Sequence, residues 1–243
     1  FISLYKQTVL GPLWYIIQPL VYTIIFTIIF GNFAKIPTDG IPPFLFYLTG
    51  NLIWSYFSFC LNQNSNIFNA NAGLFSKVYF PRLIIPITNL TNGLIQFFIQ
   101  FIIFSGFYIY FYFSGSEIKI TYYILLLPLV LLHAGILGLS VGLIISSIVT
   151  KYRDLVLALN LIVQVWLYAS PIIYPLSQVP ESIRFIYTLN PTVAVIELFK
   201  KIFLNVSSLN TSEYLISVFI TFILLLIGLK FFVKTEKNFI DTV

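Results

Sequence analysis

The chain has 243 residues, of which 59% are hydrophobic and only 9% are charged, and its mean hydropathy is +0.96. A soluble globular domain is typically about one-quarter charged, so this composition excludes that class and predicts an integral membrane protein. The net charge of +5 comes from Lys and Arg scattered between apolar runs, without the basic cluster of a nucleic-acid-binding protein. Cys60 is the single cysteine, which excludes disulfides within the chain and cysteine-based metal sites.

Six apolar runs are long enough to be membrane-spanning helices, because roughly 20 apolar residues cross a bilayer. Proline, glycine and charged residues mark their ends. The predicted spans cover residues 13–30, 44–61, 83–113, 122–149, 155–174 and 214–233. The predicted fold class is therefore an all-α integral membrane protein with six transmembrane helices. The chain opens on "FISLYKQ" and contains no Met, so we expect a further amino-terminal segment ahead of residue 1.

The loop charges predict the orientation of these spans, since Lys and Arg are enriched in cytoplasmic loops. With both termini on one side, that side carries eight Lys or Arg and three acidic residues, whereas the other side carries five of each. We therefore expect both termini to be cytoplasmic.

The stretch "SPIIYPLSQVPESIRFIYTLNPT", residues 170–192, interrupts this pattern with four prolines but stays mostly apolar. Proline ends or kinks a helix, because it lacks a backbone donor and clashes with the preceding turn. The connection 175–212 then contains two short apolar helices, too short to cross the bilayer. Two arrangements are open from the residues alone: re-entrant helices dipping into the outer leaflet, or a helix lying flat on the membrane surface.

Uncharged polar pairs lie inside two spans at helical spacing: Gln96 with Gln100, and Asn160 with Gln164. Such pairs either bond neighbouring helices or line a polar path. A small-residue stripe in the fourth span, made by Gly138, Gly142 and Ser146, favours close helix packing.

His133 is the only histidine, and no Asp or Glu lies in the interior of a predicted span, so we expect a structural role for it. Aromatic residues make up 19% of the chain, and their flat apolar faces suit both lipid contact and stacking on sugar rings. The sequence has no GxxxxGK[ST], H-E-x-x-H or G-x-S-x-G motif, which excludes a phosphate loop for a nucleotide and two common hydrolase sites.

Five segments, in this order, resemble the permease subunit of bacterial polysaccharide ABC exporters, the O-antigen, teichoic-acid and capsule exporter family of type-2 ABC permeases. They are "YKQTVLGPLWYIIQPL" (5–20), "NANAGLFSKVYFPRLIIP" (69–86), "KYRDL" (151–155), "SPIIYP" (170–175) and "LNPTVAVIELFK" (189–200). The resemblance implies a multi-pass homodimer in the bacterial cytoplasmic (inner) membrane. It also implies two copies of a separate ABC ATPase subunit, which bind ATP and Mg, with no cofactor in this chain.

The resemblance assigns expected roles to four groups of residues. The coupling helix that docks on the ATPase is expected at 66–77, with Asn66, Asn69, Asn71, Leu74, Phe75 and Lys77. The outer gate, formed by re-entrant helices, is expected to use Pro171, Tyr174, Pro175, Pro180, Tyr187, Asn190, Pro191 and Glu197. The expected channel-lining residues are Gln96, Gln100, Asn160, Gln164, Trp166 and Tyr168. The cytoplasmic entrance, with an interfacial helix, is expected to involve Lys6, Trp14, Arg82 and Arg153.

The resemblance implies export of a polysaccharide linked to undecaprenyl diphosphate. Lys77, Arg82 and Arg153 could attract the diphosphate, or could simply be the basic residues that flank cytoplasmic helix ends. Two other classes of function stay open from the residues: a membrane-embedded glycan- or lipid-modifying transferase, which needs converging acid and base groups, and a secondary transporter, which needs an ion site.

Overall fold

The computed structural model describes residues 11–71, 73, 81–116, 118, 121–152 and 154–240, and this part of the chain is all-helical, without strands. The helices are η2 (Gly11–Leu13), α1 (Trp14–Phe26) with its π-helical continuation η3 (Thr27–Phe33), α2 (Pro43–Ser65), α3 (Ile67–Ala70), α5 (Ile84–Phe113), η4 (Tyr122–Leu126), α6 (Leu127–Val149), α7 (Leu155–Tyr168), η5 (Leu176–Gln178), α8 (Glu181–Thr188), α9 (Pro191–Leu204) and α10 (Thr211–Ile240).

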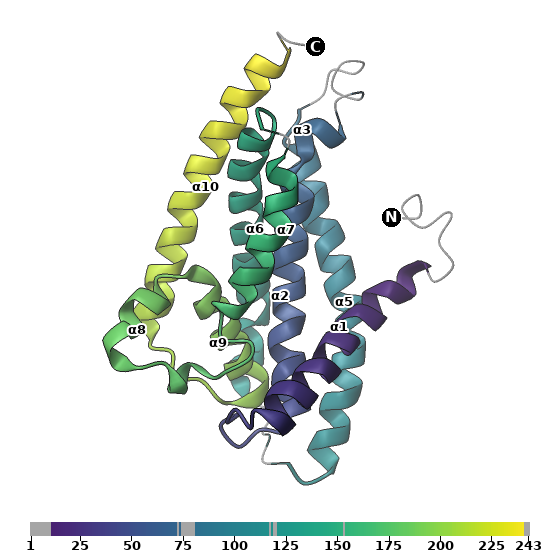
Figure 1. Cartoon of the computed structure of the whole chain (residues 1–243), viewed down its shortest axis with the longest axis vertical. Helices are drawn as coiled ribbons and strands as arrows, with labels where there is room; N and C mark the ends of the chain where they lie inside the picture. Colours follow the sequence, from purple (N-terminus) through teal and green to yellow (C-terminus); the bar gives the residue numbers. More distant parts are fainter. Residues whose placement is uncertain are drawn as a thin grey trace.

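Within the described residues, five helices are long and apolar enough to cross a membrane: Trp14–Phe33, Pro43–Ser65, Ile84–Phe113, Tyr122–Val149 and Thr211–Lys237. These five agree with predicted spans. Figure 1 shows α2, α5, α6 and α10 along the long axis, with α1 crossing them obliquely. The carboxyl end of α10 lies at the same end of the bundle as α3, and the α1–α2 connection lies at the opposite end.

The predicted fifth span, 155–174, is shorter in the structure, because α7 ends at Tyr168. A helix of 14 residues is about 21 Å long, less than the roughly 30 Å of a bilayer core. The helix ends before Pro171, which cannot continue it, and Ile172 and Ile173 are then buried in the bundle. The count of six spans therefore stays a prediction, with five supported by helix length and composition.

The core of the bundle is the contact between α2 and α6, where the predicted small-residue stripe lies. A Cβ added to Gly138 would lie 2.6 Å from the carbonyl oxygen of Phe57, and one added to Gly142 would lie 2.6 Å from the Cβ of Asn64. Only glycine allows the two backbones to approach this closely, and Ser146 is buried in the same row. The packing role predicted for the stripe is confirmed.

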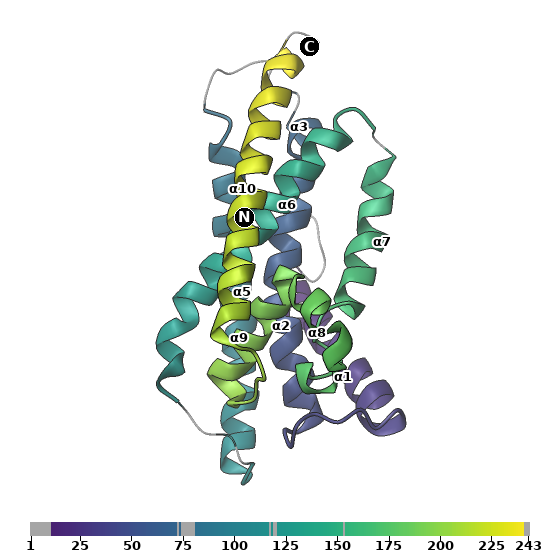
Figure 2. The ribbon, with the colours of Figure 1, turned by 90° about the vertical axis from the view of Figure 1, so that its left-hand side faces the viewer.

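The connection after α7 contains the two short helices that the sequence predicts. Helix α9 is buried on nearly every side by α2, α6 and α10, as a helix lying flat on a membrane would not be. Helix α8 is different, since Ile183, Phe185 and Ile186 are each at least 50% exposed. Figure 2 shows α8 and α9 beside the lower half of the bundle, with α7 standing to its side. Their depth in a bilayer stays a prediction.

Candidate functional site

A cavity of about 470 Å³ lies between α1, α2, α5 and α7. Its lining residues are uncharged: Gln18, Pro19, Tyr22, Phe26, Asn51, Trp54, Ser55, Ser58, Phe59, Asn62, Gln63, Gln96, Gln100, Asn160, Val163, Gln164, Leu167 and Tyr168. The wall combines amides and hydroxyls with aromatic rings, a surface that can hydrogen-bond to sugar hydroxyls and stack on sugar rings without holding an ion.

The amides of α5 supply open hydrogen-bonding capacity in this wall. The Oε1 atoms of Gln96 and Gln100 are buried, and neither accepts a hydrogen bond within the described structure. A buried carbonyl without a partner is destabilising, so polar groups at these positions favour a hydrated or ligand-bearing cavity over a dry one.

Five of the six residues predicted to line a channel meet in this cavity: Gln96, Gln100, Asn160, Gln164 and Tyr168. Trp166 does not line it. Its Nε1 donates to Oδ1 of Asn190 at 3.0 Å, and its ring packs edge-on against Phe57 with centroids 5.3 Å apart. A helix turns by about 100° per residue, so Trp166 lies on a different side of α7 from Gln164.

Sequence reasoning missed the polar residues that α2 contributes to the cavity. Asn51, Ser55, Ser58 and Asn62 follow one another at spacings of four, three and four, which places them on one face of a helix. This periodicity is present in the sequence and could have identified the face. Asn51 also donates from Nδ2 to the carbonyl oxygen of Pro19 at 3.1 Å, which joins α2 to α1 at the cavity wall.

Asn190 connects the end of α7 with the start of α9. Its Oδ1 accepts from the backbone N–H of Thr192 at 3.2 Å, as expected of a helix N-cap, and from the Thr192 hydroxyl at 2.8 Å. Its Nδ2 donates to the carbonyl oxygen of Ala169 at 3.2 Å. Together with the Trp166 contact, these bonds fix the proline-rich segment at both of its ends.

The four prolines of the predicted gate lie at or just beyond helix ends. Pro171 follows α7, Pro175 precedes η5, Pro180 precedes α8, and Pro191 is the first residue of α9. Proline suits the first position of a helix, because the N–H that it lacks would have no partner there.

Two tyrosines of the predicted gate bond to each other. The Tyr187 hydroxyl donates to that of Tyr174 at 3.2 Å, and the Tyr174 hydroxyl donates to the carbonyl oxygen of Tyr168 at 3.0 Å. This chain of contacts runs from α8 to the last residue of α7. Burial raises the pKa of the Tyr187 phenol, so the hydroxyl stays protonated. Two predicted gate residues are therefore linked to one predicted lining residue.

A buried ion pair attaches α9 to the proline-rich segment. Lys200 Nζ lies 3.5 Å from Oε1 of Glu197, donates to the carbonyl oxygen of Pro171, and stands 3.8 Å from the ring centroid of Phe46. Ser207 donates to Oε2 of Glu197 at 3.1 Å. Both charged side chains are almost fully buried. The pair could have been recognised from its spacing of three in an otherwise apolar helix.

The environment of this pair changes both pKa values. Burial raises the pKa of the Glu197 carboxyl, and the Lys200 ammonium opposes that shift. Burial lowers the pKa of Lys200 to about 8, and Glu197 opposes this change in turn. Each group therefore offsets part of the cost of burying the other's charge.

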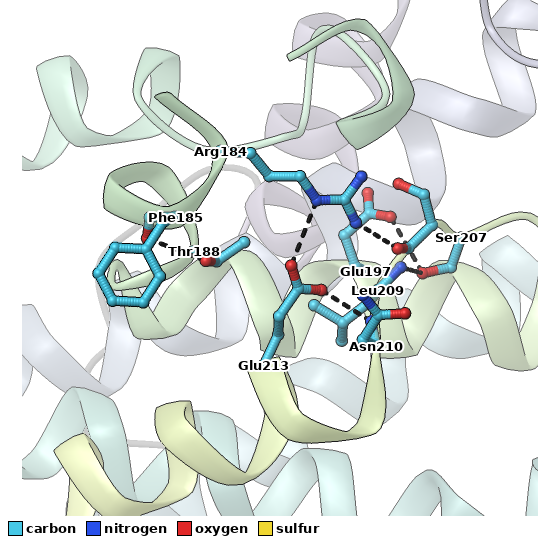
Figure 3. Close-up of polar contacts among 9 residues, drawn as sticks. Arg184, Phe185, Thr188, Glu197, Ser207, Leu209, Asn210 and Glu213 are labelled. Carbon is cyan, nitrogen blue, oxygen red and sulfur yellow. Dashed lines mark hydrogen bonds and ion pairs between the residues drawn. The ribbon is translucent and has the colours of Figure 1, made fainter. Parts of the chain in front are cut away.

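A second polar cluster holds α8 against the α9–α10 connection. Figure 3 shows Arg184 directed toward Glu213, with Nε 3.2 Å from Oε1, while its Nη2 donates to the carbonyl oxygen of Ser208. The other carboxylate oxygen of Glu213 accepts from the backbone N–H of Asn210 at 2.7 Å. Arg184 and Glu213 thus hold α8 to the start of α10.

The predicted coupling segment lies at the other end of the bundle. Its described part is α3, a single turn that carries Asn69 and is followed by Asn71, whose Nδ2 donates to the carbonyl oxygen of Ile67 at 2.9 Å. Asn66 is the non-helical residue between α2 and α3. Leu74, Phe75 and Lys77, which complete the prediction, lie outside the described residues.

The structure describes two of the four predicted entrance residues, Trp14 and Arg82, and they lie on different elements. Trp14 begins α1 and is 50% exposed. Arg82 lies near the end of α10, where its Nε is 3.7 Å from Oε1 of Glu236 and its Nη1 donates to the Glu236 carbonyl oxygen at 3.0 Å. Lys6 and Arg153 lie outside the described residues.

His133 lies between α6 and α10, as a structural residue would. Its Nε2 is 2.9 Å from Oγ1 of Thr221, and its ring packs edge-on against Tyr214 with centroids 5.4 Å apart. It stands apart from the polar cavity. This arrangement agrees with the helix-packing role predicted for it.

Comparisons with known proteins match the part of the chain that builds these sites. A family model described as "ABC-2 type transporter" matches residues 1–204, which include the helices from α1 to α9. The chain is 28% identical over 239 residues to the O-antigen export system permease protein RfbA of Klebsiella pneumoniae, covering 98% of this chain and 89% of that protein.

Two further relatives carry related names. The chain is 26% identical over 206 residues to the O-antigen export system permease protein RfbA of Myxococcus xanthus, covering 82% of this chain and 75% of that protein. It is 28% identical over 194 residues to the polysialic acid transport protein KpsM of Escherichia coli, covering 78% of this chain and 72% of that protein.

Proposed function

The chain belongs to the ABC-2 type transporter family, and we propose that it forms the channel of an exporter for a lipid-linked cell-surface polysaccharide in the bacterial cytoplasmic membrane. The observation that carries the proposal is the neutral cavity of amides, hydroxyls and aromatic rings. The names of the relatives point to glycans as cargo, since one describes O-antigen export and another polysialic acid transport.

The lining chemistry suits a polymer that must slide. Amides such as Gln96, Gln100 and Gln164 exchange hydrogen bonds with successive sugar hydroxyls, whereas a charged side chain would hold a phosphate or a carboxylate at one place. Rings at Tyr22 and Tyr168 offer stacking surfaces to each sugar in turn. A glycan can therefore bind weakly at many equivalent positions.

A second copy of the chain would complete the channel. The helices on one side of the cavity, α1 and α7, expose apolar residues, including Ile24 at 47%, Leu157 at 79% and Leu161 at 65%. A homodimer built through these helices encloses a path between two such cavities, and symmetric pairs are the commonest oligomers. The two copies of segment 66–77 in this homodimer then contact two copies of an ATPase subunit, which hold ATP and Mg.

In this proposal both termini and α3 face the cytoplasm, while α8 and α9 form the outer gate. An undecaprenyl-diphosphate-linked glycan enters beside α1, passes the cavity, and leaves where Tyr174 and Tyr187 meet. ATP hydrolysis in the partner moves the coupling segment. The hydrogen bonds and the ion pair that join α7, the proline-rich segment and α9 transmit this movement to the gate.

The experiment compares tryptophan substitutions at two positions on α5 that differ in exposure. Gln96→Trp fills the polar cavity, whereas Ile102→Trp adds the same ring on a face that is 72% exposed. With the co-encoded ATPase, we expect Gln96→Trp to reduce glycan export at least tenfold, with normal membrane levels of the chain, and Ile102→Trp to export normally. Normal export by a folded Gln96→Trp variant would remove the cavity from the transport path.

A further inference from the structure

A second cavity, of about 260 Å³, lies on another side of the molecule, between α5, η4 and α9. Its wall is almost entirely apolar: Phe101, Phe104, Ser105, Tyr108, Ile109, Ile124, Ile202 and Phe203. The base is buried, since Phe104, Ile202 and Phe203 are no more than 6% exposed, whereas Ile109 and Ile124 at the rim are 54% and 45% exposed. The cavity is therefore a recess with a buried base and an exposed rim.

A cationic group lies beside this recess. Lys201 precedes Ile202 on α9, and its Nζ stands 5.0 Å from the ring centroid of Tyr123, which precedes Ile124 on η4. Lys201 makes no ion pair with a carboxylate of the described residues. The half-buried Lys201 is therefore adjacent to the apolar recess on α9, and the tyrosine that its ammonium group contacts is adjacent to the recess on η4.

We propose that this recess binds one acyl chain of an anionic glycerophospholipid, whose phosphate is held by Lys201. The recess is larger than the roughly 150 Å³ engineered apolar cavity that stays dry and binds benzene, so hydrocarbon fits it better than water does. The lysine charge favours an anionic headgroup, because a zwitterionic lipid such as phosphatidylcholine carries its own cation beside the phosphate diester. The site is separate from the polar cavity of the proposed glycan path.

The position of the recess agrees with a lipid in the leaflet at the α1–α2 end of the bundle. Helix η4 begins the crossing that α6 continues, and residues 101–109 lie in the second half of α5. Lys201 and Tyr123 therefore lie close to a membrane surface, with the recess beneath them. A lysine near an anionic lipid surface contributes about 1 kcal/mol to binding, which corresponds to roughly fivefold in affinity.

The test uses the purified full chain and phosphatidylglycerol with a photoactivatable diazirine on one acyl chain. We expect cross-links on 101–109 and 202–203, mapped by peptide mass spectrometry. Native mass spectrometry should show preference for phosphatidylglycerol over phosphatidylcholine. Lys201→Gln should weaken phosphatidylglycerol binding about fivefold and leave phosphatidylcholine unchanged. Ile124→Trp, which fills the rim, should weaken both lipids.

Lys151→Gln is the matched control, because Lys151 also stands over a tyrosine, 5.3 Å from the ring centroid of Tyr152, but does not border the recess. Equal losses in Lys201→Gln and Lys151→Gln would overturn the proposal, as would cross-links elsewhere. Competition by free glycerol phosphate without the acyl chain, by undecaprenyl diphosphate alone, or by a second copy of the chain covering the recess would also contradict it.

Discussion

The indole Nε1 of Trp166 donates a hydrogen bond to Oδ1 of Asn190 across 3.0 Å, and that same oxygen caps the first turn of α9. One carbonyl oxygen therefore serves the last turn of α7 and the start of α9. A displacement of α7 cannot leave α9 unchanged without breaking this bond. The contact is a direct mechanical connection between the helix beside the polar cavity and the buried helix of the proposed gate.

Separate variants should resolve the two functions of Asn190. Trp166→Phe removes the indole donor and should cost about 1 kcal/mol of unfolding free energy. Asn190→Ala removes that bond and the helix cap, and should cost about 2 kcal/mol. Denaturation of the purified chain in detergent measures both. Asn190→Ala already removes the indole bond, so the double variant should be as stable as Asn190→Ala, apart from any loss of ring packing. Losses that add in the double variant would show that the indole bond contributes nothing.

The α2–α6 contact should be intolerant of even one methyl group. Gly142→Ala places a Cβ 2.6 Å from that of Asn64, so we expect a loss of about 1–3 kcal/mol from overpacking. Gly106→Ala on α5 is the matched control, because no atom lies within 4 Å of its added Cβ. It should leave the melting temperature unchanged or raise it slightly. Equal melting temperatures for the two variants would contradict the close approach.

Removing one partner of the buried ion pair should be far worse than removing both. Lys200→Met leaves Glu197 as an unpaired buried charge and should cost about 3–5 kcal/mol, whereas Lys200→Met combined with Glu197→Leu should recover most of that loss. Lys201→Met, one residue along, should change stability by less than about 0.5 kcal/mol in detergent free of anionic lipid. A single variant as stable as the double would contradict the pairing.

The same variant predicts a pH dependence. Burial raises the pKa of Glu197, and without Lys200 nothing on α9 opposes that shift. A group whose folded-state pKa is raised stabilises the fold at low pH and loses that contribution as pH rises through the folded pKa. Lys200→Met should therefore be most stable in acid and weaken toward neutral pH. Parallel pH profiles for this variant and the wild type would refute the assignment.

The proposed outer gate can be probed with a single thiol at Tyr187→Cys in a Cys60→Ser background. Tyr187 is half-buried beside Tyr174. A membrane-impermeant thiol reagent added outside should label it, and the rate should rise during glycan export as α8 moves from α7. Wild-type Cys60 is fully buried and supplies the unlabelled control. Labelling only from the cytoplasmic side would reverse the proposed orientation.

Much of this architecture could be predicted from sequence, because lipid imposes one strong constraint on helix length and composition. Five long helices and the glycine contact follow from that constraint. The early end of α7 does not, since a burial of Ile172 and Ile173 against α2 competes with continued helix. Likewise, composition alone does not distinguish Lys200, which pairs with the buried Glu197, from its neighbour Lys201, which makes no ion pair within the described residues.

For the site, spacing four places Gln96 with Gln100, and Asn160 with Gln164, on one face of their helices, and the structure shows that both faces line one cavity. Trp166, also predicted to line the channel, instead directs its indole toward Asn190. Which residues of a helix face a cavity depends on which side of the helix packs against the bundle. The short α7 packs against few other helices, so this side is hard to predict. The polar face of α2 is not evident from composition, because its serines and asparagines are interspersed with aromatic and aliphatic residues.

The uncharged wall of the polar cavity also has an electrical consequence. Moving one elementary charge across a membrane at 100 mV involves about 2.3 kcal/mol. Since none of the described cavity-lining residues carries a charge, rearrangement of that wall moves no charge through the field. At this cavity the membrane potential then acts on the charged cargo and not on the wall. Because the proposed cargo carries a diphosphate, export of even a neutral glycan would respond to voltage, and an acidic glycan would respond more strongly, in proportion to the charge that it adds.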